Sequence, residues 1–237
     1  MCGTCGCAEG GRGPGPVRSA EELRRRIPVE REILAANAGR AEALRERLAR
    51  EGVEGIGLLG APGSGKTALL EAVLPRLGGG DAVVEGDCAT ERDAHRIRVL
   101  GIPAAQVETG SLCHLDAELV ERALAGLDLG GCRRLWVENV GNLVCPAPFD
   151  CGERRRILVL STAEGEEKPE KYPAAVAACD LVVLSKVDLE EVLGFDRERF
   201  EASLRRVRPD VPLLPVSARS GAGLSELRHW VLAGGAG

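Results

Sequence analysis

LLGAPGSGKTALL, at residues 58–70, contains the pattern G-x-x-x-x-G-K-[ST] between Gly60 and Thr67. An apolar run, predicted to be a strand, precedes the pattern, and a helical pattern begins at Lys66. Glycines at these positions let backbone N–H groups turn toward phosphate oxygens, Lys66 can reach the β and γ oxygens, and Thr67 offers a hydroxyl to Mg²⁺. We therefore predict a binding loop for a nucleoside triphosphate, formed by Gly60, Gly63, Ser64, Gly65, Lys66 and Thr67.

Short apolar runs alternate with helical patterns along the rest of the chain. The runs are EGIGLLG, DAVVEG, AAQVE, RRLWVEN, RRILVLS, DLVVLS and PLLPVS. Their apolar residues are continuous and do not alternate with polar ones, which is typical of strands buried on both faces. We expect an α/β fold of the P-loop NTPase class, a SIMIBI-type G domain over residues 53–237, with a mostly parallel sheet flanked by helices.

Two further segments are expected before this domain. Residues 1–18 combine a cysteine-rich start with a glycine- and proline-rich linker, and they predict a flexible metal-binding arm. Residues 19–52 are rich in Glu, Arg, Ala and Leu, with apolar residues at three- and four-residue steps. This pattern predicts an amphipathic helix, interrupted near Pro28, that packs on the G domain.

Composition excludes several classes of partner. The 237 residues are 44% hydrophobic and carry a formal net charge of −5, so the chain has no basic footprint for nucleic acid. No apolar run approaches the roughly 20 residues that a membrane span requires, and the start of the chain does not resemble a secretion signal. We expect a cytoplasmic protein with no membrane or nucleic-acid partner and with reduced thiols.

Two segments predict the base. VVLSKVDL at residues 182–189 places Lys186 and Asp188 at the spacing of the guanine-reading N-K-x-D motif, with Ser185 where that motif prefers asparagine. PVSARSG at residues 215–221 resembles the matching S-A-[KR] loop and places Ser217 and Ala218 below the base. We predict GTP; an adenine nucleotide, or a coincidental strand end, is the alternative.

Two acids and a glycine are candidates for hydrolysis. Asp87 follows an apolar run and can hold Mg²⁺ or position the attacking water, and Glu138 follows another as a Walker-B-like acid. Gly141 suits a hinge that senses the γ-phosphate, because a residue without Cβ allows its N–H to approach closely. The alternative for either acid is a helix cap or an exposed loop residue.

The opening MCGTCGC predicts a soft metal site. Cys2, Cys5 and Cys7 supply three thiolates, and the terminal amine can act as a fourth ligand. Such a set suits square-planar Ni²⁺, while tetrahedral Zn²⁺ would also accept it. A redox role or an unbound terminus is the alternative.

A second metal site is predicted from Cys113, His114 and Cys145. Cys113 and His114 are adjacent before a helix, and Cys145 lies four residues after Gly141. A thiolate on a loop that responds to the γ-phosphate would couple hydrolysis to metal geometry. The set is incomplete, so water, Asp93 or His95, or a second subunit is expected to complete it. Four cysteines lack ligand-like spacing: we assign Cys132 and Cys179 to the core and leave Cys88 and Cys151 undecided.

The motifs GAPGSGKTALL, TGSLCHLDA and ENVGNLVCPAPFD…EGEEKPEKYP closely resemble the HypB family of nickel-incorporation GTPases over about residues 30–230. The resemblance implies slow GTP hydrolysis, dimerisation in the nucleotide-bound state and delivery of nickel to the large subunit of [NiFe]-hydrogenase with the zinc-containing chaperone HypA. It also implies phosphate, Mg²⁺ and hydrolysis roles for Lys66, Thr67, Asp87 and Glu138, guanine recognition by Lys186 and Asp188, a zinc or nickel site at Cys113, His114 and Cys145, and an arm site at Cys2, Cys5 and Cys7.

Two departures keep alternatives open. Ser185 replaces the asparagine, and no histidine-rich stretch follows the arm, so bulk nickel storage is not supported. A passive metal-sequestering protein with a vestigial nucleotide domain is one alternative. A urease-assembly GTPase is another, although its Cys-Pro-His motif is absent here because His114 directly follows Cys113.

Overall fold

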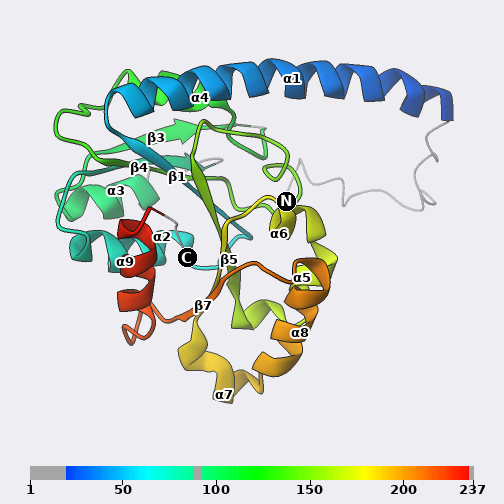
Figure 1. The fold of residues 1–237 in the computed structure, drawn as a ribbon, viewed down its shortest axis with the longest axis vertical. Coiled ribbons are helices and arrows are strands. Elements are labelled where there is room, and N and C mark those ends of the chain that lie inside the picture. Colours follow the sequence, from blue (N-terminus) through cyan, green and yellow to red (C-terminus); the bar gives the residue numbers. More distant parts are fainter. Residues whose placement is uncertain (1–19, 88–91, 111, 235–237) are drawn as a thin grey trace, which may run out of the picture. The chain divides into compact units, whose positions relative to one another are not determined.

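The computed structural model describes residues 20–87, 92–110 and 112–234, and its centre is a seven-stranded sheet (Figure 1). The strand order is β3-β2-β4-β1-β5-β6-β7, and every pairing between these strands is parallel. The strands are β1 (Glu54–Gly60), β2 (Asp81–Asp87), β3 (Ala104–Glu108), β4 (Arg134–Glu138), β5 (Arg155–Ser161), β6 (Leu181–Ser185) and β7 (Leu213–Val216). The predicted α/β class with a parallel sheet is confirmed.

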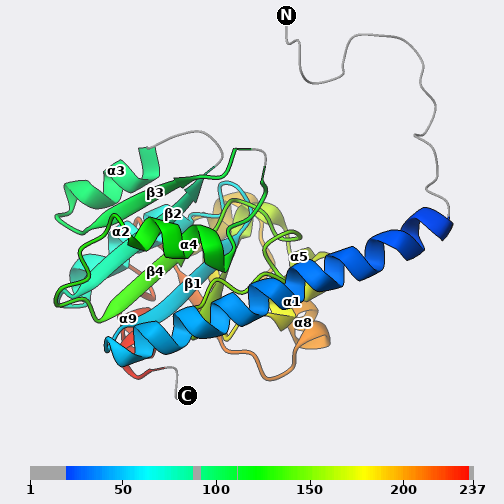
Figure 2. The same ribbon diagram turned by 90° about the horizontal axis from the view of Figure 1, so that it is seen from above.

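Helices cover both faces of this sheet (Figures 1 and 2). The α-helices are α1 (Ala20–Arg50), α2 (Lys66–Val73), α3 (Arg92–Val99), α4 (Ala117–Leu124), α5 (Lys168–Lys171), α6 (Pro173–Ala177), α7 (Glu190–Leu193), α8 (Arg197–Val207) and α9 (Leu224–Leu232). The described residues also form the short 3₁₀ turns η1 (Leu74–Arg76), η2 (Thr162–Glu164) and η3 (Val187–Leu189).

In the described part of the chain, three apolar clusters form the core. One cluster packs α2, α3 and α9 against one face of the sheet, around the fully buried Trp136 and Leu58. On the other face, α6 and α8 pack over β5 and β6, while Leu44 and Leu48 of α1 pack with α4 over β2 and β4. Strands buried on both faces need continuous apolar residues, which is the pattern that the sequence shows.

Helix α1 differs from the sequence prediction. It runs from Ala20 to Arg50 without a break, so the interruption expected near Pro28 was wrong. A proline removes one backbone hydrogen bond, and the Glu-, Arg- and Leu-rich residues around it favour the helix enough to continue. Ala36 begins the larger unit that contains the sheet, and the part of α1 before it, residues 20–35, belongs to a different unit. Among the described residues, no helix has the length and hydropathy to cross a bilayer.

Candidate nucleotide and metal site

The phosphate-binding loop leaves the carboxyl end of β1 and enters α2. Gly65 has a φ angle of 97°, a left-handed backbone conformation that residues with a side chain rarely adopt. Helix α2 begins at the next residue. The ammonium group of Lys66 donates hydrogen bonds to the carbonyl oxygens of Gly60 (3.3 Å) and Ala61 (3.4 Å). The strand end, the tight turn and the helix start therefore stand in the order that the motif requires.

A pocket of about 410 Å³, the phosphate pocket, lies beside this loop. Its lining includes Gly63, Lys66, Thr67, Glu138 and Gly141. The hydroxyl of Thr67 donates a hydrogen bond of 2.8 Å to Oε1 of Glu138, at the end of β4. The structure thus places the loop lysine, the loop threonine and the Walker-B-like acid around one cavity.

Glu85 is a residue of this pocket that the sequence analysis missed. It lies on β2 and is 2% exposed. Two carboxylate oxygens here, Oε1 of Glu85 and Oε2 of Glu138, are buried without a hydrogen-bond partner among the described residues. Burial and, second, the charge of Glu138 raise the pKa of Glu85 to about 11, so this carboxyl is protonated at neutral pH. Burial also raises the pKa of Glu138, while the charge of Lys66 and the side chains of Glu85 and Thr67 oppose this shift.

Asp87 is the last residue of β2, and its side chain lies outside the described part of the chain. Glu85 stands two residues before it in the same strand, and this spacing from a predicted acid was the available sequence signal for Glu85. Asp93 and Arg96 of α3 also line the phosphate pocket, and Arg96 pairs with Asp93 at 2.9 Å. Asp93 is therefore part of the phosphate pocket's wall.

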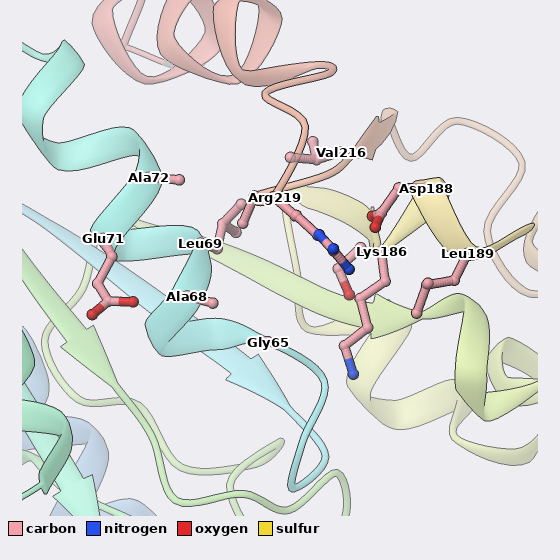
Figure 3. Close-up of a pocket in the computed structure, with 12 residues that line it drawn as sticks. Gly65, Ala68, Leu69, Glu71, Ala72, Lys186, Asp188, Leu189, Val216 and Arg219 are labelled. Atoms are coloured by element: carbon pink, nitrogen blue, oxygen red, sulfur yellow. The ribbon is translucent and has the colours of Figure 1, made fainter.

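The base pocket is a second cavity, of about 520 Å³, on the other side of α2's first turn. Figure 3 shows Lys186, Asp188 and Leu189 across the cavity from Gly65 and Ala68. Lys186 has a φ angle of 60°, a rare conformation for a residue with a side chain, and its ammonium donates a 2.6 Å hydrogen bond to the carbonyl of Gly63. The two pockets are thus joined by contacts between the base-reading turn and the phosphate loop.

The loop after β7 forms the third wall of the base pocket. Ala218 lies in the lining, together with Arg219, which the sequence analysis did not single out. Ser217 is fully buried outside the lining, and its hydroxyl oxygen accepts a 3.0 Å hydrogen bond from the N–H of Ser220. Ser217 therefore shapes the loop that presents Ala218 and Arg219.

The chain after β4 lies directly against the phosphate loop. The N–H of Asn142 donates to the carbonyl of Gly60 at 3.1 Å, and the two residues form an isolated antiparallel bridge. A Cβ added to Gly141 would come within 2.9 Å of Cα of Pro62. Close packing on the phosphate loop therefore requires a glycine at this position.

The predicted metal residues lie on two loops that follow β3 and β4. Cys113, His114 and Cys145 are partly exposed, and the His114 ring stacks on Phe149 with ring centroids 3.8 Å apart. Burial lowers the pKa of His114, which favours the neutral imidazole that binds metals. Within the described ranges, no group of three or more His, Cys, Asp or Glu side chains could hold a metal ion. Cys2, Cys5, Cys7 and Cys88 lie outside the described residues.

The remaining cysteines are described individually. Cys179 is 1% exposed and packs in the core, and Cys132 is partly buried against the core cluster under α4, as the sequence analysis expected. Cys151, left undecided there, is also 1% exposed, and burial raises its pKa well above the ordinary value. Cys151 is therefore a protonated, buried thiol.

Together, the parallel sheet, the phosphate loop and the two adjoining pockets define a P-loop nucleotide-binding protein. The CobW/HypB/UreG nucleotide-binding domain matches residues 55–215. The hydrogenase maturation factor HypB of Azotobacter vinelandii is 46% identical over 92% of this chain and 74% of its own length. The chain belongs to the HypB family.

Solved structures agree with this assignment. A crystal structure of HypB from Helicobacter pylori in complex with nickel superposes with a TM-score of 0.81 and 35% identity, over 84% of this chain and 95% of that one. HypB from Archaeoglobus fulgidus superposes with a TM-score of 0.78 and 35% identity, over 85% of this chain and 99% of that one. The resemblance inferred from the sequence motifs is confirmed.

Proposed function

We propose that the chain binds and hydrolyses GTP and uses the reaction to control a nickel ion during maturation of [NiFe]-hydrogenase. One observation carries the proposal. A single segment of eight residues, 138–145, runs from the buried acid Glu138 past the loop-packed Gly141 to the half-buried Cys145. A change at the γ-phosphate thus has a direct covalent route to a metal-binding sulfur.

For phosphate binding, Lys66 exchanges the carbonyls of Gly60 and Ala61 for phosphate oxygens, while the N–H groups at the start of α2 face the same anion. Thr67 and Glu138 offer oxygen donors to Mg²⁺, with Asp87 as a further candidate from the end of β2. The unpartnered Oε2 of Glu138 suits such a hard cation, which neutralises charge on the β and γ oxygens when bound.

Glu138 and Asp87 are the proposed residues for holding the attacking water, and Gly141 is the proposed sensor of the γ-phosphate. For the base, Asp188 accepts from the N1–H and amino groups of guanine, a donor pair that adenine lacks, and Lys186 and Ala218 bound the purine. The lining of the base pocket by these three residues supports guanine over adenine.

Nickel is the cargo of this reaction. We propose Cys113, His114 and Cys145 as its ligands, with zinc as a competitor, and a second copy of the chain to complete the set in the nucleotide-bound dimer. A HypA-type chaperone and the hydrogenase large subunit are the proposed partners, in the cytoplasm where GTP is available. We further propose that residues 1–18 form an arm in which Cys2, Cys5 and Cys7 bind nickel or zinc, ahead of a helical extension at 19–52.

The test is a nickel titration of the full chain with GDP and with a non-hydrolysable GTP analogue. We expect different nickel affinities in the two states, because a ligand shifts an equilibrium only by its differential affinity. Equal affinities would contradict the proposal. Lys66→Ala should abolish nucleotide-dependent transfer of nickel, and transfer that survives this change would favour a passive metal-sequestering protein.

A further inference from the structure

The chain after β4 holds the Cys113–His114 loop as well as Cys145. The backbone N–H of Leu115 donates a hydrogen bond of 2.9 Å to Oδ1 of Asn139, the residue that follows Glu138. The same oxygen accepts from the N–H of Val140 at 3.0 Å. The buried side chain of Asn139, which follows Glu138, therefore holds the backbone of Leu115, which follows His114.

Asn142 makes a second connection to the same loop. Its Nδ2 donates to the carbonyl oxygen of Cys113 at 3.4 Å, and its Oδ1 accepts from the N–H of Val144 at 2.9 Å. Asn142 is thus placed between the two predicted metal-binding cysteines, Cys113 and Cys145. Its side chain contacts the backbone of Cys113 and the backbone of Val144, the residue before Cys145.

A buried thiol closes the arrangement around Leu115. The thiol of Cys151 donates to the carbonyl oxygen of Leu115 at 3.3 Å, and Nδ2 of Asn139 lies 3.7 Å from the same sulfur. Both polar backbone groups of Leu115 are therefore held by side chains from the β4–β5 connection. This explains why a cysteine without ligand-like spacing lies between Asn139 and the loop.

The backbones of Asn139 and Asn142 are themselves hydrogen-bonded to β1, the strand that leads into the phosphate loop. The backbone N–H of Asn139 donates to the carbonyl of Leu58 at 3.0 Å, and that of Asn142 donates to the carbonyl of Gly60 at 3.1 Å. Gly60 is the last residue of β1 and the first of the phosphate-loop motif. A shift of residues 138–142 at the γ-phosphate must therefore change the hydrogen bonds that hold Cys113 and Leu115.

We propose that Asn139 and Asn142 are positioning residues that transmit the nucleotide state to the Cys113–His114 pair within one chain. Both parts of the ligand set then respond together: Cys145 through the backbone, and Cys113 and His114 through the two amides. This inference rests on the proposed function.

The test compares nickel dissociation constants of the full chain in the GDP state and in the state with a non-hydrolysable GTP analogue. The readout is the ratio of the two constants, so a uniform loss of nickel affinity cancels. We expect Asn142→Ala and Asn139→Ala each to bring the ratio at least about fivefold closer to one. Asn139→Asp keeps an oxygen acceptor for the N–H of Leu115 and should restore the ratio.

Val144→Ala is the matched control, because Val144 neighbours Cys145, is 64% exposed and keeps the backbone N–H that it donates to Asn142. Its ratio should equal that of the unmodified chain. If Asn139→Ala fails to fold, the partly exposed Asn142 still decides the question. An unmodified chain with a ratio far from one, together with an unchanged ratio in Asn142→Ala, would overturn this inference alone. A ratio of one in the unmodified chain would overturn the proposed function as well.

Discussion

The hydroxyl of Ser185 donates a hydrogen bond of 2.5 Å to the carbonyl oxygen of Ser64, which joins the end of β6, before the predicted base-reading residues, to the phosphate loop. Ser185 stands where the guanine-reading motif prefers asparagine, and it is 6% exposed. A hydroxyl has one proton, and this one is directed at the loop. The remaining lone pairs of Ser185 cannot bind purine N7, because N7 is itself an acceptor.

We therefore predict that N7 contributes little to nucleotide affinity. The chain should bind 7-deaza-GTP and GTP with dissociation constants within about twofold, measured by competition with a fluorescent nucleotide. A donor at N7 would instead be worth about 1 kcal/mol, or several-fold in affinity. Asp188→Asn is the control for the other edge of the base and should weaken both nucleotides equally. A loss of about tenfold or more on removing N7 would contradict the prediction.

A second prediction concerns Gly141, where a Cβ would meet the backbone of Pro62. Gly141→Ala should lower the free energy of unfolding by about 1–3 kcal/mol, because the backbone at Gly141 or Pro62 must shift to admit the Cβ, next to the Asn142–Gly60 bridge. GTP hydrolysis should fall with it, and urea unfolding and single-turnover assays measure the two effects.

Gly39→Ala is the matched control for that change. Gly39 is exposed on α1, and an added Cβ there meets nothing within 4 Å. It should stabilise the chain by about 0.5–1 kcal/mol and leave hydrolysis unchanged. If Gly141→Ala is as stable as the unmodified chain, the segment after β4 can move away from Pro62 at no cost, and the prediction is wrong.

The sequence predicted the sheet and the phosphate loop because both are set by local patterns. Continuous apolar runs show burial on two faces, and G-x-x-x-x-G-K-[ST] is one contiguous motif. Glu85 was missed because it lies within an apolar run and its spacing from Asp87 is a weak signal, whereas its pairing with Glu138 across β2 and β4 is set by the fold. Asn139 and Asn142 were missed for the same reason: their partners Leu115 and Cys113 are 24 and 29 residues away.

The cysteines provide a third prediction. Cys151 and Cys179 should resist iodoacetamide in the folded chain at pH 8, because both are 1% exposed and burial raises the pKa of Cys179 to about 12. At that pH the thiolate fraction of Cys179 is on the order of 10⁻⁴. Cys145, which is partly exposed, is the internal reference in the same peptide mass spectra. Both buried thiols should react fully in denaturant, and modification of either at the rate of Cys145 in the folded chain would contradict their burial.

The last prediction uses Glu85, whose pKa in the folded chain is about 11 compared with about 4.3 for an unfolded glutamate. Between these values the folded state binds one proton more than the unfolded state, so this group's stabilising contribution decreases as pH rises, by at most about 1.4 kcal/mol per pH unit. Glu85→Gln removes the titration and keeps the shape. The variant should therefore gain stability relative to the unmodified chain as pH rises from about 6 to 8 in urea unfolding without nucleotide or magnesium. Glu170→Gln, a change at an exposed glutamate on α5, controls for loss of charge and should show no such trend. A constant difference between Glu85→Gln and the unmodified chain across this range would mean that Glu85 is ionised in the folded state.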